Sequence, residues 1–205
     1  MTTSGADTEP AEIEPGLWRW TARHPEWRPG AVAGSPADWP AEVGSVLVEV
    51  AGAAVFIDAL VPAALWAWAD ERCAEAARVL ALTTIRFHRR SRSELIARYR
   101  AQTSRARAEL PAGIEPVPLR GAGEVDFWLA QRRTLVVGDR LLGAVGGGLR
   151  LCPESWLRYL ETGMTLSGLR DRLRPLLDLP IERVLVSHGE PVLSDGHEAL
   201  AEALR

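Results

Sequence analysis

The sequence predicts an α/β (α+β) domain, with either two β-sheets layered between helices or a single mixed sheet. Two observations carry this prediction. The first half contains a hairpin pattern at 45–58 and a further buried strand, with helical segments interspersed. The end of the chain has the pattern of a buried strand, a polar loop and a helix over 183–204. A length of 205 residues suits one domain with a sizeable core and is too short for two comfortable ones.

Composition excludes several classes of function. A formal net charge of -3 argues against a nucleic-acid or membrane-surface partner. All 24 basic residues are Arg, which we interpret as the bias of a GC-rich coding sequence. Cys73 and Cys152 lie far apart, so neither a zinc motif nor a disulfide framework is expected. The polar, acidic N-terminus lacks the features of a signal peptide, and no apolar stretch is long enough for a bilayer. We therefore expect a cytoplasmic protein.

The first 60 residues divide into a tail, an arm and a hairpin. Residues 1–12 are expected to be a disordered tail, so that the domain covers 13–205. Three tryptophans within 17–27 are too many for solvent and predict an arm or lid over the core edge. Pro, Gly and Ala make 29–40 an irregular loop. A tight turn at Ala51-Gly52 predicts that the strands on either side of it pair as a hairpin.

Apolar spacing predicts the remaining elements. In the first half we expect strands at 45–50, 53–58 and 79–84, helices at 62–78 and 93–100, and a short strand at 106–110. In the second half we expect a connector at 111–118, strands at 123–129, 134–137 and 183–187, a glycine-rich loop at 141–151, and helices at 153–161, 167–177 and 194–204.

Residues that could catalyse a reaction or bind a ligand follow the buried strands. His88 lies among arginines in the polar loop after 79–84, a favoured place for a site in an α/β protein. Asp58, Asp139 and His188 also follow strands. Asp58 has a plainer interpretation as a strand-end cap, Asp139 as a carboxylate that accepts from loop N–H groups, and His88 as an ordinary loop histidine. The plainer interpretation of His188 is a hydrogen bond to Asp139. A solvated charged face is likewise the commoner explanation for Arg86, Arg89, Arg90 and Arg92.

Four short motifs, which follow one another along the chain, carry a resemblance to a known family. They are Ile57-Asp58 followed by Leu60-Val61-Pro62, the strand end Leu82-Thr83-Thr84, a hairpin closing on Val137-Gly138-Asp139, and Ser187-His188-Gly189-Glu190-Pro191. The chain resembles the metallo-β-lactamase superfamily from about Ile13 to its end. The resemblance implies a four-layer αββα sandwich and a dinuclear zinc or iron site. In that family a Thr-His-x-His-x-Asp-His motif, a further His, the Gly-Asp carboxylate and the His-Gly imidazole bind the metals. An aspartate at the position of Asp58 is a supporting anchor.

This sequence departs from that motif in both possible registers. With Thr84 as the motif threonine, the ligand positions hold Ile85, Phe87, Arg89 and Arg90. With Thr83, they hold Thr84, Arg86, His88 and Arg89. The segment 119–124 contains no histidine either. Asp139 and His188 are thus the remaining metal-ligand candidates, and the dinuclear site is lost.

Three hypotheses of function follow. The first is a metal-free, non-hydrolytic binding or regulatory module, in which Arg86, His88, Arg89 and Arg90 bind a small anionic molecule. The second is a hydrolase of an ester, lactone or thioester with a mononuclear zinc or iron site built from His88, Asp139 and His188. The third is a structural role, in which the tryptophan-rich arm docks on a second copy to form a homo-oligomer. The first hypothesis is favoured because the His-x-His pair is absent.

Overall fold

Apolar side chains on both faces of the central strands require two buried sheets, and the computed structural model contains them. It describes residues 9–103, 106–160 and 163–205. The first sheet has the order β1-β2-β3-β4-β5, antiparallel throughout except that β4 and β5 run parallel. Its strands are β1 (Ala11–Glu14), β2 (Leu17–Arg23), β3 (Glu42–Val50), β4 (Ala53–Ile57) and β5 (Arg78–Leu82).

The second sheet has the order β11-β8-β7-β6, in which only β11 and β8 run parallel. Its strands are β6 (Ile114–Leu119), β7 (Glu124–Leu129), β8 (Thr134–Val136) and β11 (Arg183–Leu185). A separate ribbon pairs β9 (Leu141–Gly143) with β10 (Leu149–Leu151). The two parallel pairs matter for the site, because the carboxyl ends of paired parallel strands lie at the same edge of a sheet.

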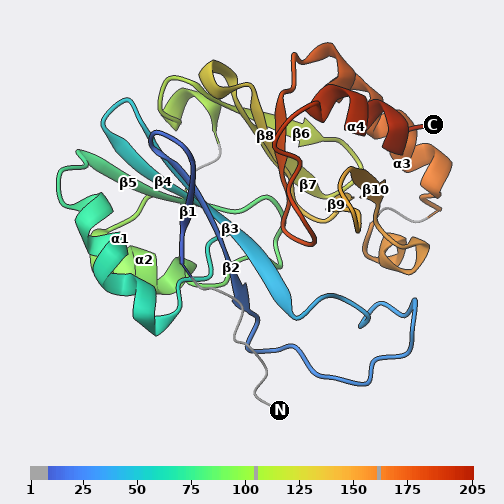
Figure 1. Cartoon of the computed structure of the whole chain (residues 1–205), viewed down its shortest axis with the longest axis horizontal. Helices are drawn as coiled ribbons and strands as arrows, with labels where there is room; N and C mark the ends of the chain where they lie inside the picture. Colours follow the sequence, from blue (N-terminus) through green and yellow to red (C-terminus); the bar gives the residue numbers. More distant parts are fainter. Residues whose placement is uncertain (1–8, 104–105, 161–162) are drawn as a thin grey trace.

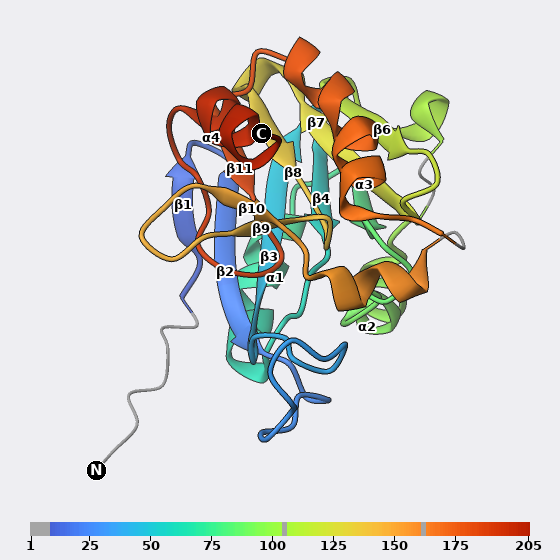
Figure 2. The ribbon, with the colours of Figure 1, turned by 90° about the vertical axis from the view of Figure 1, so that its right-hand side faces the viewer.

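Helices cover the outer face of each sheet, as Figures 1 and 2 show. Helices α1 (Trp66–Cys73) and α2 (Arg92–Tyr99) pack on the first sheet through a core that includes Trp20, Phe56 and Leu95. Helices α3 (Leu166–Leu173) and α4 (Gly196–Ala203) pack on the second sheet. A third core, which includes Val55, Phe127 and Leu185, fills the space between the sheets. The expected αββα sandwich is confirmed.

Residues 17–23 of the tryptophan-rich segment are not an arm. Residues 17–23 form β2, which pairs with β1 on one side and β3 on the other. Trp18 and Trp20 are buried under α1, where both lie edge-on to Trp68. These two rings are therefore unavailable to a second subunit. The first strand begins at Ala11, inside the segment expected to be a tail, whereas residues 1–8 lie outside the described part.

Two segments expected to be irregular contain strands. The connector at 111–118 includes β6, which tolerates Pro116 and Pro118 because it is the edge strand and needs fewer donors. The glycine-rich segment at 141–151 is the β9–β10 hairpin, with Gly146, Gly147 and Gly148 in the turn and Gly143 in β9. Conversely, the strand expected at 106–110 is a 3-10 turn at Arg107–Glu109.

The helices are shorter than the apolar spacing suggested. The segment expected to be helical from 62 to 78 is a 3-10 turn at Ala63–Leu65 followed by α1, and it ends at Cys73. Glu154–Tyr159 is a 3-10 helix, and another, Arg174–Asp178, extends α3. Within residues 9–103, 106–160 and 163–205, no helix combines the length and the apolar character that a membrane span requires.

Candidate functional site

The candidate site lies where β4, β5, β8 and β11 end. Asp58 follows β4, and the turn containing His88 follows β5. In the other sheet, Asp139 follows β8 and His188 follows β11. Because each pair of strands is parallel, the two sheets deliver all four side chains to one edge of the sandwich.

Asp58 joins three of these loops. Its Oδ1 accepts the backbone N–H of Thr84 at 2.8 Å, and its Oδ2 accepts the Thr84 hydroxyl. The same Oδ2 lies 2.8 Å from His88 Nδ1 and accepts the Ser187 hydroxyl at 3.2 Å. Asp58 is buried, so these contacts replace the water that a free carboxylate would bind. It therefore supports His88 as well as ending its own strand.

His88, Asp139 and His188 converge on one point. His88 Nε2 lies 3.0 Å from Asp139 Oδ1, and His188 Nε2 lies 3.4 Å from the same oxygen. These three ligand atoms lie within 4.8 Å of one another. Neither approach is aligned as a hydrogen bond, since Asp139 Oδ1 is buried without a hydrogen-bond partner among the described residues. The two imidazoles and the carboxylate thus converge on one position, the focus of the site.

Glu124 fixes the loop that carries Asp139, a role that the sequence did not suggest. Its carboxylate accepts backbone N–H groups from Gly138 at 3.0 Å, Asp139 at 2.7 Å and Arg140 at 3.2 Å. Its Oε2 also lies 3.6 Å from Arg140 Nε. Burial raises the pKa of Glu124, and burial together with the Glu124 charge raises the pKa of Asp126 well above its usual value. The feature of the sequence that could have indicated this role was a glutamate on the inward face of a strand.

The loop that carries His188 is held from three sides. The backbone N–H of Gly143 in β9 donates to the His188 carbonyl at 2.9 Å. The N–H of Gly44 in β3 donates to Ser187 O at 2.7 Å, and Arg19 in β2 donates to Gly189 O at 3.1 Å. The first sheet and the ribbon therefore set the position of the loop that carries this imidazole.

Opposite charges dominate the electrostatics of the cluster. Burial alone would favour neutral His88, but the charges of Asp139 and Asp58 outweigh it and raise the pKa of His88 to about 9. Burial opposes ionisation of Asp139 too, yet His88 holds the pKa of that carboxyl well below its usual range. Burial lowers the pKa of His188, which keeps its imidazole neutral. The cluster thus combines a charged pair with one neutral imidazole.

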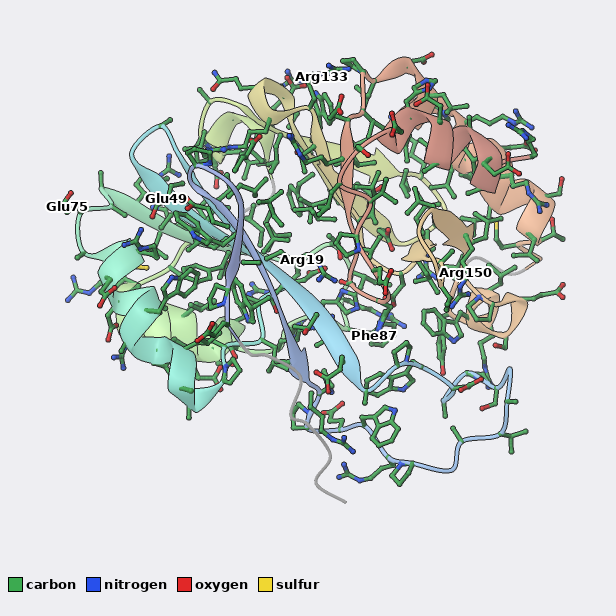
Figure 3. All side chains as sticks on the ribbon, viewed as in Figure 1. Arg19, Glu49, Glu75, Phe87, Arg133 and Arg150 are labelled. Atoms are coloured by element: carbon green, nitrogen blue, oxygen red, sulfur yellow. The ribbon has the colours of Figure 1, made fainter. Side chains whose placement is uncertain are left out.

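A cavity of about 350 Å³ opens above this cluster. His88, Asp139 and His188 line it together with Arg90 and Arg140. Its walls are rich in aromatic side chains, contributed by Trp39, Phe87, Trp156 and Tyr159. Trp39 and Trp156 lie edge-on to His188, at ring distances of 6.2 and 5.7 Å. Phe87, labelled in Figure 3, is exposed and lies edge-on to Tyr159 at a ring distance of 5.8 Å.

The arginine-rich loop divides into residues inside and outside this cavity. Arg90 lines it, and its Nη1 donates to Gly44 O at 2.6 Å and to the carbonyl of Asp58. Arg86 is exposed and packs over the Phe87 ring at 4.6 Å, and Arg89 is also exposed. The structure thus brings together four of the predicted site residues, His88, Arg90, Asp139 and His188, and leaves Arg86 and Arg89 at the surface.

The three converging residues fit a single metal ion. Two imidazoles and a carboxylate are ligands that zinc and iron accept. Metal–ligand bonds of about 2.0–2.1 Å put neighbouring tetrahedral ligands about 3.3 Å apart. The separations of 3.0 and 3.4 Å at Asp139 Oδ1 agree with that spacing. A carboxylate behind a ligand histidine is the usual support in metal sites, and Asp58 stands in that position behind His88.

The overall fold is shared with metallo-β-lactamase structures. The chain is similar to a metallo-beta-lactamase from Erythrobacter litoralis, with 15% identity, TM-score 0.61, and coverage of 95% of this chain and 89% of the other. It also resembles a metallo-beta-lactamase family protein from Thermus thermophilus, with 18% identity, TM-score 0.54, and coverage of 93% and 78%. A third structure, DIM-1 metallo-beta-lactamase, has 12% identity, TM-score 0.59, and coverage of 95% and 97%. No family model and no curated protein sequence matches the chain.

Proposed function

We propose that this chain, which has the metallo-β-lactamase fold, is a hydrolase with a mononuclear metal site formed by His88, Asp139 and His188. The observation that supports the proposal is the convergence of His88 Nε2, Asp139 Oδ1 and His188 Nε2 in the lining of one cavity. Three protein ligands with an open position are the usual arrangement of a catalytic zinc site. Esters, lactones and thioesters are the proposed substrate classes.

Each residue of the proposed site has a separate role. When bound, zinc or iron supplies Lewis acidity and a nucleophile from water near neutral pH. Asp58 orients the His88 ring through Nδ1 and so directs Nε2 at the focus. Glu124 holds the backbone on both sides of Asp139 and thereby aims its carboxylate. The aromatic walls exclude water around an apolar substrate.

Metal analysis of protein purified without chelator tests this proposal. We expect about one equivalent of zinc or iron per chain, and ester or lactone hydrolysis that stops on chelation and returns with metal. Asp139→Ala and His188→Ala should lose both the metal and the activity. His197→Ala is a matched control, because His197 lies in α4 and contacts Leu177 O instead of the cluster. Metal-free wild-type protein that still hydrolyses these substrates would rule the proposal out.

The second candidate is the metal-free binding module, and a specific observation favours it. Protonated His88 and Arg90 place two positive charges beside the carboxylates of Asp58 and Asp139. The cluster can therefore balance its charge without a metal ion. The same measurement separates the two candidates. Metal content below a tenth of an equivalent after growth with added zinc and iron, together with no hydrolysis, would favour the binding module.

A further inference from the structure

Arg90 lines the cavity, and one edge of its guanidinium group is buried and unpaired. Its Nη1 is anchored to the carbonyls of Gly44 and Asp58. Its Nε and Nη2 are buried and form no hydrogen bond within the described residues. Nε–H and Nη2–H point to the same side of a planar group, which is the geometry that grips both oxygens of a carboxylate.

An unpaired buried cation edge is costly, so a partner for it is expected. Elsewhere in the described structure, the same edge of another arginine is filled. Arg98 donates from both Nε and Nη2 to Asp70. Neither nearby carboxylate fills this edge of Arg90, because Asp58 accepts from Thr84, His88 and Ser187, and Asp139 forms no hydrogen bond with Arg90. The free edge is therefore left to a molecule that enters the cavity.

We propose that Arg90 binds a carboxylate of the substrate, next to the His88–Asp139–His188 focus, and so selects carboxylate-bearing molecules with an aromatic or apolar body. The substrate class rests on the proposed function; the binding of a carboxylate does not. A phosphate monoester is disfavoured, because a dianion would meet Asp58 and Asp139 around a single guanidinium. The body of the molecule fits the walls formed by Trp39, Phe87, Trp156 and Tyr159.

Binding measurements on chelator-treated protein separate Arg90 from any metal. The probes are 3-phenylpropionate and its neutral amide, titrated by calorimetry. We expect wild-type protein to bind the carboxylate about 10–100-fold more tightly than the amide, the range for a hydrogen bond to a charged group. Arg90→Met should bring this ratio close to one. Arg89→Met is the matched control, since Arg89 is the exposed neighbour, and should keep the wild-type ratio.

Arg90→Met also removes the anchors to Gly44 and Asp58, so the fold could suffer. Arg90→Lys keeps a donor for these carbonyls but loses the two-pronged edge, and should lower the ratio to an intermediate value. Equal binding of the two probes by wild-type protein, or an unchanged ratio in Arg90→Lys, would overturn the inference. Metal-loaded enzyme then tests the substrate class, with an aryl ester bearing a terminal carboxylate against its neutral analogue. Tight carboxylate binding without ester hydrolysis would reject the proposed function and keep the Arg90 site.

Discussion

Asp58 is the residue on which the site most depends outside its three converging side chains. It has a left-handed backbone with φ of 49°, an uncommon conformation for a residue other than glycine. The carboxylate compensates with contacts to Thr84, His88 and Ser187, which belong to loops from both sheets. A side chain that ends one strand thus also ties together loops that follow other strands.

Asp58→Asn should weaken both the fold and the site. The amide keeps the shape but loses the charge that pairs with His88, and its NH₂ group faces donors. We expect the free energy of unfolding to fall by roughly 1–3 kcal/mol. Metal affinity should fall about 10–100-fold, the usual effect of removing a support behind a ligand histidine.

Urea unfolding and competition with a chromophoric chelator measure the two effects. Asp195→Asn is the control, because Asp195 is exposed, has φ of 56° and makes no capping hydrogen bond from its side chain. Its unfolding free energy should stay within about 0.5 kcal/mol of wild type. Wild-type metal affinity in Asp58→Asn would show that His88 is not oriented through Nδ1.

At the scale of elements, the β9–β10 hairpin is the feature that most clearly supports the site. Gly143 in β9 packs directly on the backbone of Glu190, and its N–H donates to His188 O. A side chain at position 143 would overlap that backbone, which has no freedom to rotate away. The hairpin and the loop after β11 are therefore fitted to each other at the level of main-chain atoms.

Gly143→Ala should separate the two segments and move His188. We expect a loss of roughly 1–3 kcal/mol in unfolding free energy, the usual cost of overpacking, and a clear drop in metal affinity. Gly168→Ala in α3 is the contrasting control, because the added methyl would meet only Met164 and Thr165 side chains at 3.4 and 3.5 Å. Gly168→Ala should raise the free energy of unfolding by about 0.5–1 kcal/mol. Calorimetric melting measures the stability, and chelator competition measures the metal affinity. Wild-type values of both for Gly143→Ala would contradict this account.

Elements with local signals could be predicted from the sequence, and elements set by distant neighbours could not. The hairpin of β3 and β4 follows from its Ala51-Gly52 turn, and the burial of β5 follows from its apolar run. Nothing local reveals that β6 pairs as an edge strand despite two prolines, because its partner β7 supplies the pairing. The glycine-rich hairpin was missed for a similar reason, since its packing against Glu190 decides its structure.

The site shows the same division between local and distant signals. Asp139 and His188 stand out because each follows a buried strand with a glycine beside it. His88 could be suspected from its loop, but its approach to Asp139 depends on the packing of two sheets. Glu124, Trp39 and Trp156 carry no motif at all, and only the folded chain brings them to the cavity and its supporting loop. Arg86 and Arg90 share one loop, yet the backbone turn sends only Arg90 inward.

At the scale of the whole molecule, the core between the sheets sets the distance between the two halves of the site. His88 belongs to the first sheet, and Asp139 and His188 belong to the second. Phe127 is fully buried in that core, among side chains from both sheets. The separation of the ligand atoms therefore depends on side chains that never touch the site.

Phe127→Ala should lower the free energy of unfolding by about 3–5 kcal/mol, because it leaves a cavity between the sheets. It should also weaken metal binding, since the sheets can shift relative to each other. Val145→Ala serves as the control at a fully exposed position in the β9–β10 turn and should change neither quantity. Urea unfolding monitored by tryptophan fluorescence provides the comparison. A loss of stability with unchanged metal affinity would show that the site tolerates movement of the core.

The spread of the three converging residues along the chain has a consequence for biosynthesis. On the ribosome His88 emerges first of the three, Asp139 follows after β8, and His188 appears only when β11 is complete. A nascent chain lacks the last imidazole and the loop contacts that Ser187 makes with Asp58 and Gly44. Chains that terminate before β11 therefore lack His188 and the loop that carries it, so the proposed metal site can form only after β11 has been made.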